Sequence, residues 1–334
     1  NKHRLIMTTY KEIKGTQIEV VSSDPSNPVE GQVWYNSTDQ AVKGRAVTTT
    51  GSWSTTTALN TGRNGISGAG ANNSAVVGFG GQTPPSTYHT DTETWNGSNW
   101  TEVNNLNQGK KLTMSFGIST AAISAGGYTG DKTGNSETWN GTNWTEGNNL
   151  NQNRYNGAGV GLYTSGLVFG GYGPVATGKT ETYDGTSYTE VNDLNTSRYG
   201  IRGSGTQTSA LGFGGYTPGG QSAVTELWNG TNWTEVNDLN QARYNTAGEG
   251  SSNTTGLAFG GQPGTGPSAT LTEDWNGTNW SEQNDLNTGR VQLGSGGNSA
   301  TSVLAFGGEG PPATLTSTEE WVVGAGVTRT FTDS

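Results

Sequence analysis

Hydrophobic and polar positions alternate in short runs along this chain, and one run recurs six times. Each copy ends a small apolar segment with a Gly-Gly pair, at residues 80–81, 126–127, 170–171, 214–215, 260–261 and 307–308, so that the copies lie 44 to 47 residues apart. Repeats of this length and pattern are typical of short β units that pack against their neighbours. We therefore expect an all-β fold with one four-stranded sheet per repeat.

Within one repeat the pattern predicts four short strands. In residues 144–183 they are 144–146, 157–161, 167–169 and 181–183, separated by turns rich in Asn, Ser and Gly. The second strand consists of small residues and Val, whereas the first and last carry aromatic residues. Small side chains suit strands crowded around a central axis, and bulky ones suit the outer strands, where neighbouring sheets diverge.

The sequence Trp-Asn-Gly-Ser-Asn-Trp at residues 95–100 predicts a tight hairpin that places Trp95 opposite Trp100. Related sequences begin at Trp139, Tyr183, Trp228 and Trp275. In the copy that begins at Tyr183 both aromatic residues are Tyr, as expected for two side chains in contact. We interpret the Asn-x-Ser/Thr sequences inside these hairpins as turn chemistry, not as glycan acceptors.

Acidic and basic residues also keep one register in every repeat. A base follows the Leu of each repeat by four residues, and an acid lies two residues before the aromatic residue that ends each repeat. The leucines are Leu59, Leu106, Leu150, Leu194, Leu239 and Leu286. The bases are Arg63, Lys110, Arg154, Arg198, Arg243 and Arg290, and the acids are Glu93, Glu137, Glu181, Glu226, Glu273 and Glu319. We expect one structural ion pair per repeat. Arg holds a carboxylate better than Lys does, so the repeat with Lys110 is expected to be the least tightly held.

The first and last aromatic residues of the series lack a partner in sequence. No hairpin precedes Trp53, and no Asn-Gly turn follows Trp321. We expect the strand around Trp53 to complete the sheet that ends at Trp321, which would close the repeats into a ring without free edges. Residues 327–331 are the alternative outer strand. The predicted fold is a six-bladed β-propeller over residues 51–334, preceded by an extended β-hairpin arm over residues 1–50.

The base, the double glycine and the spaced aromatic pair resemble the repeats of the kelch family of β-propellers. This resemblance covers residues 53–321. It implies a kelch-type propeller that serves as a binding platform or, as in galactose oxidase, as an enzyme scaffold. The copper site of galactose oxidase needs His, Tyr and Cys ligands. This chain has no Cys, and its two histidines are His3 and His89, so we expect no such site.

The N-terminal segment resembles the start of virion proteins from marine tailed phages, through residues 10–20 and 25–36. The pattern predicts a strand, a Pro-punctuated turn and a hairpin, with Tyr10, Trp34 and Tyr35 as candidate docking residues. The resemblance implies a place in the virus particle and other virion proteins as partners, and it allows a homo-oligomer there. The alternative is a strap that packs on its own propeller.

Composition narrows the chemistry that the chain can perform. A net charge of -10 and a sequence pI near 4.7 disfavour nucleic-acid binding, and no apolar run approaches the length of a membrane span. Most acidic residues are periodic, which favours loop capping over catalysis. We therefore expect no catalytic residue, metal or cofactor. A bacterial secreted or surface adhesin and a carbohydrate-active enzyme remain the alternatives to a phage tail, fibre or decoration protein.

The loops after the Gly-Gly pairs differ between repeats, and variable loops on a rigid scaffold commonly bind ligands. The candidate ligand-facing residues are Tyr88, His89, Tyr128, Asp131, Tyr172, Tyr216, Gln262 and Glu309. Tyr128, Tyr172 and Tyr216 share one register and are predicted to form an aromatic arc suited to stacking on sugar rings. The alternative is that they only pack the edges of the sheets. Host-surface glycan or protein is the expected ligand.

Overall fold

The computed structural model describes residues 18–26, 32–46, 50–264, 269–311, 313–323 and 327–331. Every regular element in these segments is a β-strand, which confirms the all-β class. No helix in the described segments is long and apolar enough to cross a membrane. The chain divides into two compact units. Unit 1 takes its residues from the ranges 1–50 and 323–334, and unit 2 is Gly51–Val322.

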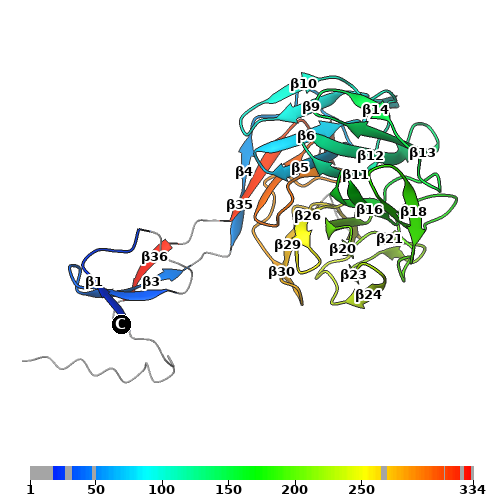
Figure 1. The fold of residues 1–334 in the computed structure, drawn as a ribbon. Coiled ribbons are helices and arrows are strands. Elements are labelled where there is room, and N and C mark those ends of the chain that lie inside the picture. Colours follow the sequence, from blue (N-terminus) through cyan, green and yellow to red (C-terminus); the bar gives the residue numbers. More distant parts are fainter. Residues whose placement is uncertain are drawn as a thin grey trace, which may run out of the picture. The chain divides into compact units, whose positions relative to one another are not determined.

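Unit 2 contains six four-stranded sheets, numbered in chain order with the innermost strand first (Figure 1). Sheet 1 is β5 (Ser67–Asn72), β6 (Ala75–Phe79), β9 (Thr92–Trp95) and β10 (Trp100–Val103); sheet 2 is β11 (Met114–Ile118), β12 (Ala121–Tyr128), β13 (Lys132–Trp139) and β14 (Trp144–Glu146); sheet 3 is β15 (Ala158–Leu162), β16 (Ser165–Phe169), β17 (Thr180–Tyr183) and β18 (Tyr188–Val191). These strands pair antiparallel with their neighbours.

The remaining sheets of unit 2 repeat this arrangement. Sheet 4 is β19 (Arg202–Thr206), β20 (Ser209–Phe213), β23 (Thr225–Trp228) and β24 (Trp233–Val236); sheet 5 is β26 (Ala247–Ser252), β27 (Thr255–Phe259), β29 (Thr272–Trp275) and β30 (Trp280–Glu282); sheet 6 is β31 (Gly294–Gly296), β32 (Ser302–Phe306), β35 (Thr318–Val323) and β4 (Gly51–Thr56). Short ribbons in the connections are β7 (Gln82–Thr83) with β8 (Thr87–Tyr88), β21 (Tyr216–Thr217) with β22 (Gly220–Gln221), β25 (Arg243–Tyr244) with β28 (Gln262–Pro263), and β33 (Glu309–Gly310) with β34 (Ala313–Thr314).

The outer hairpins follow from their turn sequence. In sheet 1, Trp95 lies opposite Trp100, with 5.5 Å between the ring centroids. The Asn96 side chain accepts the backbone N–H of Asn99 at 2.9 Å, and Gly97 has a φ of 91°, which favours glycine. The hairpins of sheets 2 to 5 use the same turn chemistry, so the expected cross-strand aromatic pairs are present there.

Crowding explains why the innermost strands consist of small residues. A Cβ atom added to Gly68 of β5 would lie 2.3 Å from the carbonyl oxygen of Ser295, on β31 of the neighbouring sheet. The innermost strands contact one another in the order β5, β11, β15, β19, β26 and β31, and β31 contacts β5 again. The six sheets are therefore neighbours in a closed cycle.

One residue from each sheet also joins a closed ring of backbone hydrogen bonds. In each case the N–H donates to the carbonyl of the counterpart in the preceding sheet at 2.7 to 3.1 Å, and the last bond runs from Gly65 to Gln292. The ring residues are Gly65, Leu112, Asn156, Gly200, Asn245 and Gln292. All six have a positive φ of 53° to 64°, which is uncommon for residues with a side chain. The six positions of the ring therefore share one left-handed backbone conformation, although they are not all occupied by the same residue type.

Aromatic side chains of the outer strands hold each sheet against the preceding one. Trp144 of sheet 2 donates its indole N–H to the Thr92 hydroxyl of sheet 1 at 2.9 Å and packs against Phe79. The same hydrogen bond joins Trp100 to Thr318, Trp233 to Thr180, Trp280 to Thr225 and Trp53 to Thr272. In sheet 3 the aromatic residue is Tyr188, whose hydroxyl accepts a hydrogen bond from Ser136 at 3.2 Å.

Sheet 6 combines strands from both ends of unit 2. Strand β4, which contains Trp53, lies beside β35, which contains Trp321. Asn284 of sheet 5 donates its side-chain N–H to the carbonyl of Gly51 at 2.7 Å, which fixes the start of β4. The alternative outer strand, residues 327–331, is β36 and pairs with a strand of unit 1 instead. Unit 2 therefore ends at Val322 and not at residue 334, as the sequence had led us to expect.

Unit 1 contains a four-stranded sheet of order β1-β2-β3-β36. Its strands are β1 (Glu19–Val21), β2 (Val33–Asn36), β3 (Ala41–Ala46) and β36 (Val327–Phe331). Strands β2 and β3 form the expected hairpin, β1 lies parallel to β2, and β36 lies antiparallel to β3. The hairpin is thus not an extended arm but the middle of a sheet to which both ends of the chain contribute.

The carboxylate of Asp24 organises unit 1. It accepts hydrogen bonds from Asn36 Nδ2 at 2.7 Å, from the indole Nε1 of Trp34 at 3.0 Å and from Lys43 Nζ at 2.9 Å. These donors stabilise the ionised form, so the pKa of Asp24 falls to about 2, with Asn36 contributing most. Because all three partners lie on the β2–β3 hairpin, Asp24 ties the preceding segment to it.

Candidate ligand-binding face

In each sheet of unit 2, the residue after the periodic base forms an antiparallel β-bridge with the residue after the Gly-Gly pair. In sheet 4, Tyr199 donates its backbone N–H to the carbonyl of Tyr216 at 3.1 Å, and the carbonyl of Tyr199 accepts the N–H of Tyr216 at 2.7 Å. The six bridges are Asn64–Gln82, Lys111–Tyr128, Tyr155–Tyr172, Tyr199–Tyr216, Tyr244–Gln262 and Val291–Glu309. Side chains opposite each other in such a bridge emerge on the same side.

The periodic base brings neighbouring bridges together. The carbonyl of Arg198 accepts the N–H of Gly171 at 2.9 Å, and the same bond links the base and the second glycine at all six junctions between sheets. Tyr199 follows Arg198, and Tyr172 follows Gly171. Their rings therefore meet across the junction of sheets 3 and 4, with 5.2 Å between centroids.

Seven tyrosines join into one continuous aromatic surface, which we call the tyrosine arc. Its members are Tyr88, Tyr128, Tyr155, Tyr172, Tyr199, Tyr216 and Tyr244. Consecutive ring centroids lie 5.1 to 5.9 Å apart, in the tilted and edge-on geometries that aromatic pairs prefer. Every ring of the arc is partly exposed. The arc thus presents a row of rigid amphipathic side chains to solvent.

Polar residues occupy the rest of the circuit. Lys111 donates to the side-chain oxygen of Gln82, and its Nζ lies 6.0 Å from the ring centroid of Tyr128. Asn64 donates its side-chain N–H to the carboxylate of Glu309 at 3.2 Å. Burial lowers the pKa of Lys111, and the charge of Glu309 acts in the opposite direction. Charge is therefore placed beside the arc and not within it.

Two tyrosines of the arc have a raised phenol pKa. Burial raises the pKa of Tyr155 and of Tyr199 above the ordinary value for a phenol, and the neighbouring Tyr172 and Tyr216 add to the effect. Both phenols therefore keep their proton at neutral pH and can donate and accept a hydrogen bond. The arc combines apolar ring faces with neutral hydrogen-bonding groups.

The structure distributes the predicted ligand-facing residues over three places. Tyr128, Tyr172 and Tyr216 lie in the arc as expected, and Tyr88 forms its end. Gln262 and Glu309 lie in the bridges. Asp131 lies in the exposed turn after β12, where its carboxylate accepts the backbone N–H of Lys132 at 2.8 Å. Its pKa is lowered chiefly by that bond, so Asp131 caps a turn beside the arc.

His89 holds together the loop that follows the first Gly-Gly pair. Its Nε2 lies 2.8 Å from the hydroxyl of Thr83, and its Nδ1 lies 2.9 Å from the carboxylate of Asp91. The three side chains resemble a hydroxyl–His–carboxylate triad in order. However, the Thr83 hydroxyl also donates to the carbonyl of Gly62 at 3.2 Å, so it is engaged in holding the loop.

Sequence reasoning missed three members of the arc, namely Tyr155, Tyr199 and Tyr244. Each directly follows a periodic Arg, so the signal was an Arg-Tyr dipeptide in three consecutive repeats. The dipeptide predicts a continuous arc only when it is known that the base of one sheet contacts the Gly-Gly pair of the neighbouring sheet. The three missed tyrosines fill the gaps between those that share the predicted register.

The six expected acid–base pairs are all in contact, and both partners are buried in each. Arg154 Nη1 lies 2.6 Å from Glu181, whose other oxygen accepts the backbone and side-chain N–H groups of Asn151 at 2.9 and 2.7 Å. Lys110 is the most distant base, 3.3 Å from Glu137. Burial lowers the pKa of Lys110, and Glu137 opposes this shift. The pairs anchor the residues that precede the bridges.

The candidate docking residues of unit 1 differ in accessibility. Tyr10 lies outside the described residues. Trp34 is fully buried, because its ring packs inside unit 1 and its N–H is satisfied by Asp24. Tyr35 is half-buried. Trp34 therefore supports the fold of unit 1 and presents no docking surface, contrary to its predicted role.

No protein-family model matches the sequence, and no curated protein matches it. In the described part of the chain, no group of three or more His, Cys, Asp or Glu side chains is placed to hold a metal ion.

Proposed function

We propose that this chain is a non-enzymatic structural protein of a phage virion, in which unit 2 is a six-bladed kelch-type β-propeller that binds host-surface glycans. The observation that carries the proposal is the tyrosine arc, seven ring systems in contact across neighbouring sheets. The repeats supply the same scaffold in every sheet, whereas the residues at the bridge positions, which form the arc, differ between repeats.

Three features of unit 2 support a propeller. Six sheets of four strands each contact their neighbours in a closed cycle. The innermost strands consist of small residues, and the outer hairpins carry aromatic pairs, as in a radial array. Sheet 6 joins β4 to β35, which is how propellers protect their edges. With the Gly-Gly and base register, these features favour the kelch type.

The chemistry of the arc favours a neutral carbohydrate as ligand. Sugar rings present C–H groups on their faces and hydroxyl groups around their edges, which match aromatic rings and phenol hydroxyls respectively. Tyrosine loses little side-chain entropy on binding, so a row of them is an efficient contact surface. Because the arc carries no charge, an uncharged or weakly charged polysaccharide fits better than a strongly acidic one.

The place in a virion rests on the resemblance of residues 10–20 and 25–36 to phage proteins. Unit 1 supports it only in a general way, because a separate compact unit can attach to another protein while unit 2 binds a ligand. A cryo-EM reconstruction of the native particle tests this part. Density for unit 1 against another virion protein would support it, and absence of the chain from purified particles would refute it.

Glycan binding is tested by titrating the full chain with neutral and acidic polysaccharides in a calorimeter. The double variant Tyr172→Ala/Tyr199→Ala should bind the preferred polysaccharide at least ~10-fold more weakly, about 1.4 kcal/mol. The control is Tyr163→Ala, which removes a half-buried tyrosine from the turn between β15 and β16, at the other end of β15 from Tyr155. Binding by the double variant equal to that of the wild type would exclude the arc.

A further inference from the structure

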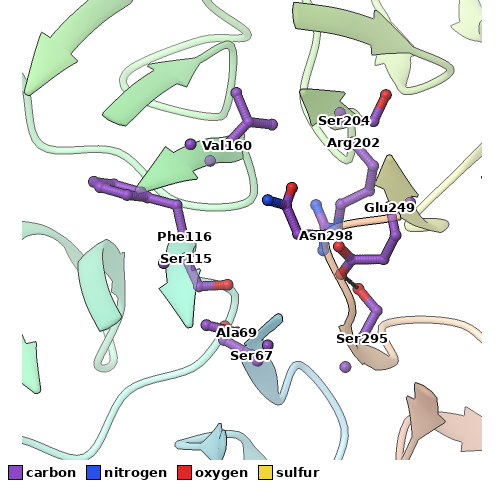
Figure 2. A pocket seen from close by; sticks show the side chains of 18 of the residues that line it. Ser67, Ala69, Ser115, Phe116, Val160, Arg202, Ser204, Glu249, Ser295 and Asn298 are labelled. Atoms are coloured by element: carbon purple, nitrogen blue, oxygen red, sulfur yellow. Dashed lines mark hydrogen bonds between the residues drawn. The ribbon is translucent and has the colours of Figure 1, made fainter. Parts of the chain in front are cut away.

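A cavity of about 80 Å³ lies among the innermost strands of unit 2 (Figure 2). Glycine and serine make up most of its lining, as the crowding of these strands requires. Two ionisable side chains interrupt this pattern, Arg202 of β19 and Glu249 of β26, and both face the open space. None of the arc tyrosines lines the cavity, so the two regions are separate.

Arg202 is unlike the other arginines of unit 2, because it has no carboxylate partner. Its Nη1 donates to the carbonyls of Ile201 and Gly157 at 2.8 and 3.2 Å and to the Asn156 side chain at 3.4 Å. Within the described segments, neither its Nε nor its Nη2 has an acceptor. The five other arginines of unit 2 each pair with a glutamate. Arg202 is half-buried, and a partly desolvated guanidinium without a counter-ion favours an anion from outside.

Glu249 does not supply that counter-ion. No ion pair joins it to Arg202 in the described part of unit 2. One of its carboxyl oxygens accepts the hydroxyl of Ser295 at 2.8 Å, and the other has no partner among the described residues. Burial raises the pKa of Glu249 to about 8, so the group is mostly uncharged at neutral pH. Burial lowers the pKa of Arg202 to about 10, so the guanidinium stays charged.

Among the described residues that line the cavity, no other side chain is titratable. The strands packed against β26 are β19, β20, β27 and β31, and among them only β19 contributes an ionisable residue, Arg202. The remaining inner strands, β5, β11 and β15, contain none. At neutral pH the cavity therefore carries one net positive charge.

We propose that this cavity binds a small carboxylate anion, with the Arg202 guanidinium as its principal donor and the Glu249 carboxyl group as a second polar group lining the same space. The planar guanidinium matches a carboxylate, which can take two parallel N–H bonds. The hydroxyl of Ser115, which has no other partner in the described structure, lines the same space as a further donor. The glycines keep the wall free of side chains that would fill the site.

The test uses the full chain and acetate, with acetamide as the neutral analogue of the same size. Titration followed by calorimetry or by NMR of isotope-labelled acetate should show saturable binding of acetate and none of acetamide. Arg202→Gln should weaken acetate binding at least ~10-fold, while far-UV circular dichroism checks the fold. Phosphate and chloride are titrated in the same way, as alternative anions. Equal or tighter binding of either, or equal binding by Arg202→Gln, would overturn a carboxylate site at Arg202.

A second variant keeps the test decisive if Arg202→Gln does not fold. Wild-type affinity for acetate should fall as pH rises through about 8, because Glu249 then ionises and repels the anion. Glu249→Gln mimics the protonated acid and should bind acetate at neutral pH and keep that affinity at higher pH. Loss of acetate binding in Glu249→Gln at neutral pH, or an affinity that falls equally in both proteins, would contradict the proposed arrangement. Glycan binding at the arc should be unchanged in both variants.

Discussion

The indole ring of Trp53 packs against that of Trp321, with 5.3 Å between the ring centroids. The two residues come from opposite ends of unit 2 in sequence and lie on neighbouring strands, β4 and β35. Trp53 also contacts Phe259 and donates to the Thr272 hydroxyl, both in sheet 5. The Trp53 side chain thus packs within sheet 6 and also joins sheet 6 to sheet 5.

Replacing Trp53 by Ala should destabilise unit 2 by about 3–5 kcal/mol, because it leaves a cavity at the junction and removes the hydrogen bond to Thr272. Urea unfolding followed by near-UV circular dichroism measures the effect. Trp53→Phe keeps most of the packing, so its free energy of unfolding should fall clearly less than that of Trp53→Ala. An unchanged unfolding midpoint in Trp53→Ala would mean that β4 does not contribute to the stability of sheet 6.

The ion pair of sheet 2 can be strengthened. Lys110→Arg should raise the free energy of unfolding by about 1 kcal/mol, because a guanidinium can bond to Glu137 and to nearby carbonyls together. The reciprocal change, Arg154→Lys in sheet 3, should lower it by a similar amount. Both are measured by urea unfolding. An unchanged free energy of unfolding in both variants would show that the identity of the base does not matter at this position.

The hydrogen bond between Ser136 and Tyr188 should appear as a coupling energy. Tyr188→Phe and Ser136→Ala each remove one partner, and the double variant removes both, so a double-mutant cycle isolates the pair. We expect a coupling of about 1 kcal/mol in favour of the pair, since both groups are buried. A coupling near zero would indicate that the two hydroxyl groups do not stabilise each other.

Glu249 should make stability depend on pH. The folded state raises the pKa of this carboxyl from its ordinary value of 4.5 to about 8, so folding favours the protonated form. The associated stability is present below pH 4.5 and is lost as pH rises through about 8. Glu249→Gln cannot ionise, so it should be more stable than the wild type at alkaline pH, by about 1–3 kcal/mol after allowance for water in the cavity.

The comparison is made by recording thermal unfolding of both proteins over a pH series. At acid pH the two melting temperatures should differ least. Acidic groups elsewhere, such as Asp24 with its lowered pKa, are the same in both proteins and cancel in the difference. A constant gap between the two proteins across the series would refute the role of Glu249.

Within the tyrosine arc, the effect of a substitution should depend on position. Tyr199 contacts Tyr172, Tyr216 and Tyr244, whereas Tyr88 contacts Tyr128 alone within the arc. Tyr199→Ala should therefore weaken glycan binding ~10-fold, about 1.4 kcal/mol, and Tyr88→Ala less. Tyr199→Phe separates ring stacking from the hydroxyl. Equal losses at both positions would contradict this dependence on position, and a larger loss in Tyr88→Ala would place the ligand at the Tyr88 end instead.

The repeated part of the fold was predictable from the sequence, because each repeat supplies an independent view of the same contact. The simultaneous change to Tyr183 and Tyr188 indicated a touching pair, and their ring centroids lie 4.6 Å apart. The fixed spacing of bases and acids indicated ion pairs in the same way. The missing partners of Trp53 and Trp321 indicated how sheet 6 is completed.

Features that occur once, or that depend on junctions between sheets, were not predictable. Residues 327–331 alternate like an outer strand, and the pattern alone does not state which edge they join. Arg202 and Glu249 stand at inner positions occupied by other residues in most repeats, so no register linked them. The ring conformation at Leu112 and Gln292 had no signal, because left-handed backbone is favoured by Gly and Asn.

The pairing of β3 with β36, and of β4 with β35, sets an order on biosynthesis. Sheets 1 to 5 use strands that are close in sequence and can form as the chain leaves the ribosome. Strands β3 and β4 are made before the five sheets that separate them in sequence from their partners β36 and β35. Both therefore keep an unpaired edge while those sheets are synthesised, the condition under which strands pair with the wrong chain. Yield of this protein in a foreign host should accordingly depend on how fast the intervening residues are translated.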